Sequence, residues 1–486
     1  MADKTRAGQG QYRQVNPLDR DGQRTRHHGE GRAAMTEPAA ARFPRRPLIA
    51  MMLGAILNPI NSSIIAVALV PIGNAFDAPA SQTAWLVSAL YLATSIGQPL
   101  VGKFVDLYGA KRLFLAGAAL TGIAGLVGTF APNFWVLVAA RVILGFGTCA
   151  GYPAAMSLIR KVADRTGLTS PAGVLTLLSV TVQTIAVIGP TLGGILIDFG
   201  GWRATMAVNL PLSLAALILG WRFVPSYDDE EPNHARPWLD WAGVALFAVV
   251  LVGLLLFLMD PQPRQWWKAA IAIASGALFT RRELRIQRPF IDIRVLSGNV
   301  PLLLTYARGL TSATTSYLFI YGFTQWLEQG RGVSPTLAGL ILLPTFAVGI
   351  VISSLFGRHP QIRAKLIVGG AFQTLVGVVL LFTANESPLW FLFVTTALLG
   401  IPQGLLSLSN QNALYRQAEP AALGASSGLL RTFQYLGAII ASAASGLAFG
   451  HAATTTGLHA LAMFMIVVSA LALTITLADR SLSRGL

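Results

Sequence analysis

The 486-residue chain is 53% hydrophobic and only 12% charged, and its mean hydropathy is +0.59. So little polar surface excludes a soluble globular protein of this size and indicates a polytopic membrane protein. The formal net charge of +15 would suggest a nucleic-acid partner in a soluble protein, but Lys and Arg also collect in the cytoplasmic loops of membrane proteins. We therefore expect a lipid bilayer around the chain and no nucleic acid bound to it.

Reactive and metal-binding residues are scarce along the chain. The single cysteine, Cys149, lies in an apolar stretch, which excludes an internal disulfide framework and a cysteine-based metal cluster. We find no nucleophile elbow, no phosphate-binding loop and no cluster of His and Cys. The sequence therefore predicts a protein that is not an enzyme and that binds no metal or cofactor.

The first 46 residues are hydrophilic and basic, unlike the rest of the chain. Gly, Arg, Gln and His are scattered through them without apolar periodicity, and they lack the short apolar core of a signal peptide. We expect a disordered cytoplasmic tail. An arm that binds anionic lipid is the alternative interpretation of this segment.

Apolar runs of about twenty residues follow the tail, each long enough to cross a hydrocarbon core of about 30 Å as a helix. Fourteen such runs predict an all-α membrane protein, and the eighth run is the shortest. The runs cover residues 48–74, 83–105, 112–130, 133–158, 171–198, 203–223, 239–259, 266–280, 301–326, 335–356, 365–383, 388–414, 421–449 and 456–478.

The distribution of positive charge predicts the orientation of these helices. If the N-terminus is cytoplasmic, 29 of the 36 Lys and Arg residues fall on the cytoplasmic side, four fall in outside loops and three fall within helices. An odd number of spans would reverse the later loops and remove this asymmetry. We therefore expect both termini in the cytoplasm, and a bacterial plasma membrane as the location.

The spacing of the runs suggests six helices, then two, then six. A polar linker, PSYDDEEPNHARP, separates the sixth run from the seventh. Many transporters are built from repeated halves that rock about a site near the bilayer midplane, and we expect a monomer of this kind. The expected parts are a tail at 1–46, a first half at 47–224, a linker with two inserted helices at 225–297, a second half at 298–480 and a tail at 481–486.

The turn between the second and third runs, GKFVDLYGAKR, places a carboxylate beside basic residues. Such a turn can form a charge lock between helices that breaks when the two halves move. The alternative is a positively charged cytoplasmic loop in which the aspartate only caps a helix. The residues of this candidate latch are Gly102, Asp106, Gly109, Lys111 and Arg112.

Two further patterns lie inside predicted helices. Arg141 precedes Gly145 in the fourth run, and because an arginine is costly inside a membrane it should face the bundle interior, either in a proton or substrate relay or as a structural brace. The fifth run contains IGPTLGG, in which Pro190 removes a backbone hydrogen bond and bends the helix. The glycines beside it, which allow a neighbouring helix to approach, are Gly189, Gly193 and Gly194.

These three patterns, with the stretches at 239–243 and 283–296, resemble the fourteen-helix drug:proton antiporter branch of the major facilitator superfamily. The resemblance covers about residues 48–480. It implies a bundle of two six-helix halves with two inserted helices, a conformational role for the charged turn, an exporter-type kink in the fifth helix and protons as the coupling ion. The sequence differs from the family pattern at Leu107, where the family usually has arginine, and at Asn61, where this branch often has aspartate.

The substrate site should lie among polar residues within the helices. We find no carboxylate well inside a predicted helix, whereas three arginines fall within helices. Because a buried charge needs a partner, this pattern favours a neutral or anionic substrate, although backbone carbonyls could also satisfy the arginines. Hydrogen bonding between helices is the alternative role for the other polar residues. The cavity candidates are Asn58, Asn61, Tyr91, Gln98, Arg308, Tyr317, Tyr321, Gln325, Gln403, Asn410, Gln411 and Arg431.

The sequence as a whole predicts an efflux transporter of the multidrug type. It would export small amphipathic molecules by alternating access, and the family resemblance implies that proton entry drives it. The alternative within transport is an exporter or facilitator of an organic anion or an endogenous metabolite, without a dedicated acidic proton site. The alternative from another class is a membrane sensor or scaffold that does not transport.

Overall fold

The computed structural model is all-helical, and the residues that it describes contain no β-strand. This confirms the predicted all-α membrane fold. The described residues lie within one compact unit, Arg42–Leu486. The predicted disordered tail lies outside them except for its last residues, and so does most of the predicted linker. The described ranges are 44–166, 172–225, 239–287, 289–291, 293–296, 298–356, 359, 361–419 and 423–483.

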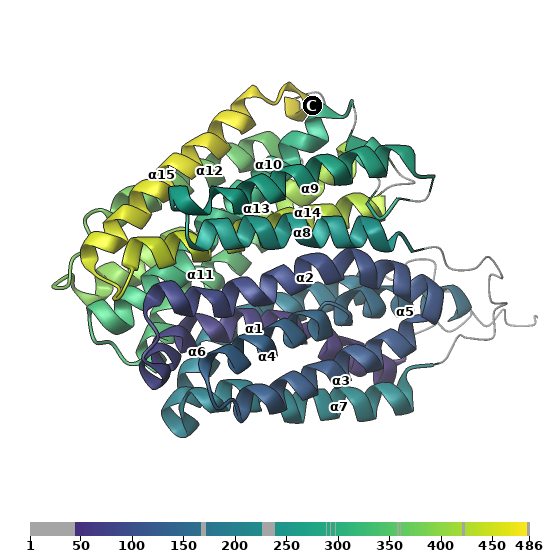
Figure 1. Cartoon of the computed structure of the whole chain (residues 1–486), viewed down its shortest axis with the longest axis horizontal. Coiled ribbons are helices and arrows are strands. Elements are labelled where there is room, and N and C mark those ends of the chain that lie inside the picture. Colours follow the sequence, from purple (N-terminus) through teal and green to yellow (C-terminus); the bar gives the residue numbers. More distant parts are fainter. Residues whose placement is uncertain are drawn as a thin grey trace, which may run out of the picture. The chain divides into compact units, whose positions relative to one another are not determined.

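Helices α1 to α7 pack together into what we call the first bundle (Figure 1). α4 and α5 together occupy the single predicted run at 133–158, and α6 contains a break at Gly201, where φ is 65°. The bounds are α1 Arg45–Phe76, α2 Ala80–Tyr108, α3 Ala110–Thr129, α4 Phe134–Thr148, α5 Gly151–Thr166, α6 Ala172–Ala207 and α7 Asn209–Phe223.

Two helices form an inserted pair, and the remaining helices form the second bundle. The inserted pair is α8 (Trp241–Met259) and α9 (Trp266–Arg285), which pack against each other and are followed by a short 3-10 turn, η2 (Ile293–Leu296). The second bundle begins with α10 (Val300–Tyr317), which continues into two π-helical turns, η3 (Leu318–Phe323) and η4 (Trp326–Gly330). Its other helices are α11 Pro335–Phe356, α12 Ile362–Leu380, α13 Leu389–Gln417, α14 Leu423–Phe449 and α15 Thr455–Ala478.

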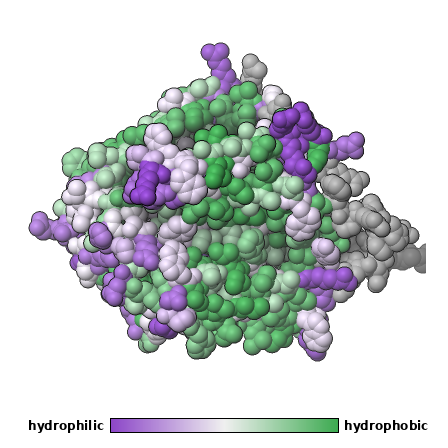
Figure 2. Space-filling model, viewed as in Figure 1, coloured by the Kyte–Doolittle hydropathy of each residue, from purple (hydrophilic) through white to green (hydrophobic). Residues whose placement is uncertain are grey.

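Eleven of the described helical segments are long and apolar enough to cross a membrane. α7 is shorter and apolar, and α9 and α10 lie outside the set of eleven, so these three would complete the predicted fourteen. Large apolar side chains are exposed on the helices, among them Phe199, Trp221 and Val467. Figure 2 shows apolar residues over the middle of one face, which is the expected pattern for a surface in contact with lipid.

Helix contacts define where the two bundles meet. In the first bundle α1 packs against α6 and α7, and in the second α10 packs against α14 and α11 against α13. The bundles touch along α6–α11 and along α2–α14. α8 lies beside α2 and α14, so the inserted pair also contacts both bundles (Figure 1).

The two ends of the bundle are named here by their turns. α2 and α3 are joined at Gly109, whose φ of 85° is a conformation that favours glycine, and we call this end the turn end. α1 and α2 are joined at the opposite end, which we call the far end. There the N–H of Asp77 caps α1 by donating to the carbonyl oxygen of Gly73.

Candidate functional site

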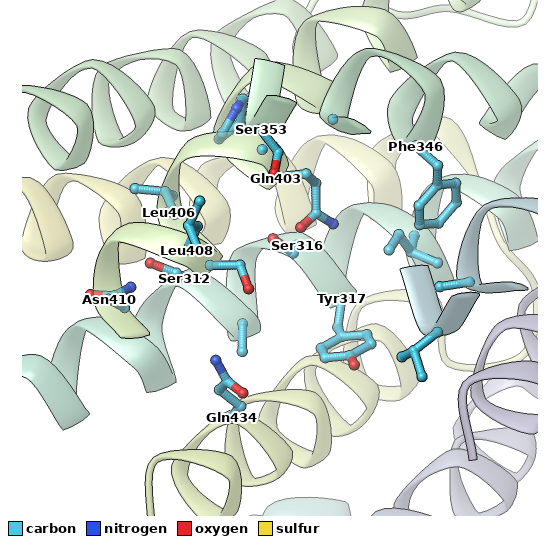
Figure 3. Close-up of a pocket in the computed structure, with 18 of the residues that line it drawn as sticks. Ser312, Ser316, Tyr317, Phe346, Ser353, Gln403, Leu406, Leu408, Asn410 and Gln434 are labelled. Carbon is cyan, nitrogen blue, oxygen red and sulfur yellow. The ribbon is translucent and has the colours of Figure 1, made fainter. Parts of the chain in front are cut away.

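A cavity of about 430 Å³ lies between the two bundles. Its walls come from α1, α5 and α6 on one side and from α10, α11, α13 and α14 on the other. Figure 3 shows Ser316, Gln403 and Gln434 facing the same space from three different helices. Because both bundles contribute to its walls, any relative movement of the bundles must change the shape of this cavity.

The lining of the cavity is polar without being acidic. Its hydrogen-bonding groups are hydroxyls and amides, and no Asp or Glu is among the described lining residues. The charged group in the lining is Arg431, whose guanidinium carbon lies 5.9 Å from the centre of the Tyr152 ring, across the gap between the bundles. The polar and aromatic lining residues include Ser62, Ser63, Tyr152, Ser312, Ser316, Tyr317, Phe346, Ser353, Gln403, Ser407, Asn410, Gln411, Gln434 and Tyr435.

A cluster of four tyrosines, two of which line the cavity, connects the bundles. Tyr91 of α2 stacks on Tyr435, with ring centres 5.5 Å apart, and lies 5.4 Å from the ring of Tyr317. The hydroxyls of Tyr91 and Tyr321 are 3.0 Å apart, and the Tyr321 hydroxyl also donates to the carbonyl oxygen of Ser62 over 3.4 Å. Tyr317 and Tyr435 face the cavity, while Tyr91 and Tyr321 support them from behind. The wall therefore offers aromatic faces to a ligand.

The far end of the interface between the bundles is closed. Thr191 of α6 donates to the carbonyl oxygen of Gly339 on α11 over 3.2 Å, and Asp198 accepts a hydrogen bond from Thr336. Across the other seam, Ser442 of α14 donates to the carbonyl oxygen of Ala84 over 2.9 Å. The backbones also meet at this end, where the N–H of Ser81 donates to the carbonyl oxygen of Gly450 over 3.0 Å.

The turn end of the cavity is accessible. Ser407 and Arg431 line the cavity towards this end, and both are exposed. Arg431 approaches Tyr152 of the first bundle only at long range, with 5.9 Å between its guanidinium carbon and the centre of the ring. The cavity is therefore closed at the far end and reachable from the turn end.

Arg308 does not line the cavity, because its guanidinium is used elsewhere. Its Nη1 donates to Asp479 over 2.7 Å, and both side chains are buried, with exposed fractions of 1% and 2%. Its Nη2 donates to Thr305 and its Nε to Asn410. Asp479, the residue that ends α15, also accepts hydrogen bonds from Ser481. The expectation that the interior arginines lack carboxylate partners is therefore wrong for Arg308.

Asn61 and Arg141 lie behind the cavity, inside the first bundle. The side-chain amides of Asn61 and Asn209 pair, with N–O distances of 2.6 and 2.9 Å. Arg141 is fully buried and donates from Nε to the carbonyl oxygen of Leu86 over 3.0 Å and from Nη1 to that of Asn61 over 3.4 Å. These contacts join α1, α2, α4 and α7.

The other predicted cavity residues divide into two groups. Tyr317, Gln403, Asn410, Gln411 and Arg431 line the cavity. Three further candidates are outside its lining. Asn58 donates to Thr148 over 3.1 Å, Gln325 donates to the carbonyl oxygen of Tyr321 over 3.2 Å, and Gln98 lies on α2 with its side-chain oxygen buried.

The candidate latch is only partly described. The side chain of Asp106 lies outside the described residues. Gly102 has open space where a side chain would be, Lys111 is half-buried, and Arg112 is exposed and makes contacts of its own. The role of this turn therefore remains a prediction.

The glycines around Pro190 allow helices to approach closely. A β-carbon at Gly189 would lie 1.8 Å from the Ser63 hydroxyl oxygen on α1, and one at Gly194 would lie 2.5 Å from the Cα of Thr336 on α11. Gly193 approaches α1 in the same way, and a β-carbon at Gly145 would lie 2.6 Å from the carbonyl oxygen of Leu90 on α2. The Gly-Pro segment thus packs α6 against both bundles at once.

Several residues of the site escaped the sequence pattern. Asp479 lies at the very end of the last helix, 171 residues from its partner Arg308, so no local signal connects them. Asn209 is the first residue of α7, and it lies 148 residues along the chain from its partner Asn61. The serines and Phe346 of the lining carry no distinctive motif.

Similarity to known proteins agrees with this architecture. Residues 51–442 match the family model described as Major Facilitator Superfamily. An uncharacterized MFS-type transporter, YwoD of Bacillus subtilis (strain 168), is 32% identical over 435 residues, which cover 86% of this chain and 93% of the relative. The multidrug efflux pump LfrA of Mycolicibacterium smegmatis (strain ATCC 700084 / mc(2)155) is 28% identical over 428 residues, covering 85% of this chain and 82% of the pump.

A solved structure shares the fold at low sequence identity. It comes from a study of substrate recognition in proton dependent oligopeptide transporters and aligns with a TM-score of 0.65 at 16% identity, covering 91% of this chain and all of that chain. The family model spans most of the described helices, so the chain is a multi-pass membrane transporter and not an enzyme. It belongs to the major facilitator superfamily.

Proposed function

We propose that this transporter exports small amphipathic molecules from the cytoplasm, as a member of the fourteen-helix drug:proton antiporter branch. The observation that carries the proposal is the cavity between the bundles, which is closed at the far end and accessible from the turn end. The count of positive charge assigns the turn end to the cytoplasm of a bacterial plasma membrane. A substrate would then enter from the cytoplasm and leave when the far end opens.

The lining favours substrates that carry no positive charge. A cationic drug bound here would meet Arg431 and no carboxylate among the described lining residues. Aromatic faces on Tyr317 and Tyr435 and the surrounding amides and hydroxyls suit a flat, uncharged or anionic molecule with several hydrogen-bonding groups. This observation also supports the second candidate function, export of an organic anion or an endogenous metabolite.

Coupling to protons requires a carboxyl group whose charge can change. Both side-chain oxygens of Glu328, on η4 near the far end, are buried without a hydrogen-bond partner in the described part of the chain. Asp198 of α6 adds a second negative charge nearby, and an unpaired charge at such a place is costly. We propose that Glu328 takes up a proton when the far end opens, that its neutral form allows that end to close, and that the proton is released to the cytoplasm before the far end opens again.

Transport by purified protein in liposomes tests this function. We would load dyes that differ in charge and record both dye export and proton flux across an imposed pH gradient. We expect export of neutral and anionic dyes at higher rates than a cationic dye of similar size, together with proton movement that depends on substrate. Glu328→Gln should abolish the dependence on the gradient, whereas Glu386→Gln, at an exposed loop carboxylate, should not.

Each other outcome selects an alternative. Export without proton flux at any gradient would favour an uncoupled facilitator. Preferential export of the cationic dye would contradict the substrate class inferred from the cavity. The absence of transport for every compound would favour the sensor or scaffold.

A further inference from the structure

The inserted pair contains two buried carboxyl groups, remote from the central cavity. Asp240 is the residue that precedes α8, and Glu283 lies in the last turn of α9, beyond the apolar part of that helix. Their exposed fractions are 1% and 0%. A pair of buried acids outside the cavity calls for a physical explanation, because desolvated like charges disfavour each other.

The two carboxyl groups face one another across Gly243. A β-carbon at Gly243 would lie 2.4 Å from Asp240 Oδ2 and 2.5 Å from Glu283 Oε1, so these two oxygens are at most about 5 Å apart. Only glycine fits at this position without displacing one of them. The sequence therefore leaves room for two acidic oxygens in one small space.

The partners of the two acids are unequal. Asp240 accepts hydrogen bonds from Arg282, with the shortest N–O distance 2.8 Å, and from the backbone N–H of Gly243 over 2.9 Å. Glu283 accepts through Oε2 from the backbone N–H of Ile291 over 3.0 Å, and the backbone of Phe290 also forms a hydrogen bond with its carboxyl group. Its Oε1 is buried without a partner among the described residues. A proton on Oε1 could be donated to Asp240 and would satisfy both oxygens.

A lysine from the first bundle completes the cluster. Lys103 of α2 donates to the carbonyl oxygen of Pro289 over 2.6 Å, and its ammonium lies 5.7 Å from the centre of the Phe290 ring. Phe290 is buried against Phe247 of α8, with ring centres 5.7 Å apart. The segment 289–291 is thus fastened on one side by Glu283 and on the other by Lys103, directly before the chain enters the second bundle.

The surroundings of Glu283 bring the pKa of its carboxyl group into the physiological range. The pKa of the Glu283 carboxyl is raised to about 7, with burial as the largest cause. The charge of Asp240 also raises this pKa, whereas the backbone hydrogen bonds from Ile291 and Phe290 and the charge of Lys103 lower it. Burial alone would raise the pKa of Asp240, but its bonds from Arg282 and Gly243 hold that pKa below the ordinary value. Among the described residues, the charged groups that act on Glu283 are Asp240, Lys103 and Arg282.

We propose that Asp240 and Glu283 form a proton-binding site at the turn end, and that its occupancy sets how firmly α2 is held to the inserted pair. When the site is empty, the negative charge of Glu283 attracts Lys103 and keeps segment 289–291 against α2. When a proton is bound, that attraction is lost and the two acids share the proton. α2 is the helix that leads into the charged turn at Gly109, so the site acts on the part of the first bundle that must move when the turn end opens or closes.

Infrared difference spectra of the full-length protein, titrated from about pH 5 to about pH 9, test the site directly, because a protonated buried carboxyl has its own C=O stretch. We expect a carboxyl band with a midpoint near 7. It should be absent in Glu283→Gln and unchanged in Glu419→Gln, an exposed carboxylate. Because Glu328 is also a buried carboxyl, these spectra are compared in a Glu328→Gln background. There, a midpoint near the ordinary value for Glu, or a band that survives in Glu283→Gln, would overturn the proposal.

Two further variants keep the test decisive if Glu283→Gln does not fold. Lys103→Met removes a positive charge and should raise the midpoint, whereas Asp240→Asn removes a negative charge and should lower it, each by roughly half a unit or more. Shifts in the same direction, or no shift in either variant, would contradict the assignment of the band to this cluster.

The hold on α2 is tested by chemical labelling of lysine side-chain amines. The labelling is carried out at one fixed pH, about pH 8, where wild-type Glu283 carries its charge. Relative to Lys111, we expect Lys103 to react roughly two- to fivefold faster in Glu283→Gln than in the wild type or Glu419→Gln. Equal rates would show that the proton does not control the hold on α2. Neither measurement involves substrate or transport, so its failure is distinct from a failure of the proposed export function.

Discussion

Each bundle contains a buried arginine, and the two arginines have different kinds of hydrogen-bond partner. Arg141 of the first bundle is held by backbone carbonyl oxygens of α1 and α2. Arg308 of the second bundle is held by the carboxylate of Asp479 and by Thr305 and Asn410. Both side chains are buried to the same degree, so burial alone does not determine how a cation is satisfied.

This difference predicts how each bundle responds to the loss of its arginine. The carbonyls around Arg141 belong to regular helices, so they keep a helix hydrogen bond when the arginine is absent. Asp479 keeps its hydrogen bonds from Ser481 when Arg308 is removed, but it loses the cation that compensates its buried charge. The second bundle therefore depends on its arginine more strongly than the first.

The largest expected effect follows from breaking the pair in the second bundle. Arg308→Met should lower the free energy of unfolding by about 3–5 kcal/mol, because the buried carboxyl group of Asp479 loses its cationic partner. Thermal unfolding in detergent measures the loss. The double variant Arg308→Met with Asp479→Leu is the control and should recover most of it. Equal losses in the single and double variants would show that the pair is not the source of the effect.

A smaller effect is expected in the first bundle. Arg141→Met should lower the free energy of unfolding by about 1–2 kcal/mol. Two hydrogen bonds to backbone carbonyl oxygens are lost, but no buried carboxylate loses its cation. The same unfolding assay applies, with Arg203→Met as a control at an exposed arginine. A loss as large as that of Arg308→Met would mean that Arg141 has a charged partner that these contacts do not reveal.

The smallest effect is expected where the bundles meet. Tyr91→Phe removes the hydroxyl that contacts Tyr321, but Tyr321 keeps its bond to the carbonyl oxygen of Ser62. We expect a loss of about 0.5–1 kcal/mol and no change for the exposed control Tyr108→Phe. Transport assays would add a second measurement. A faster transport rate in Tyr91→Phe would show that this hydrogen bond holds the two bundles together, as distinct from stabilising either bundle by itself.

The helices themselves were largely predictable. Runs such as 48–74 and 335–356 are long, apolar and bounded by turn residues, and α1 and α11 form over nearly the same ranges. The run at 133–158 is one membrane span but two α-helices, because the helix is interrupted at Cys149 and Ala150. Hydropathy measures how an average stretch partitions into lipid and is insensitive to a local break of this kind.

The candidate site was predictable only in part. Tyr317, Gln403, Asn410, Gln411 and Arg431 were expected in the cavity, and they line it. Arg308 and Asn61 have the same polar character, yet they are used between helices. A polar residue in a membrane helix must find a partner, and the sequence does not say whether that partner is a neighbouring helix or a ligand.

The sequence by itself determined a multi-pass, all-helical chain, the charged turn after α2 and the glycines that bring α6 close to its neighbours. These properties depend on local composition and on residue size, which one stretch of sequence contains. Only the tertiary structure decided that Arg308 meets Asp479, that Asn61 meets Asn209 and that Asp240 and Glu283 share one small space. Each of those pairings joins different helices, and the energy of a buried polar group depends on what is packed against it.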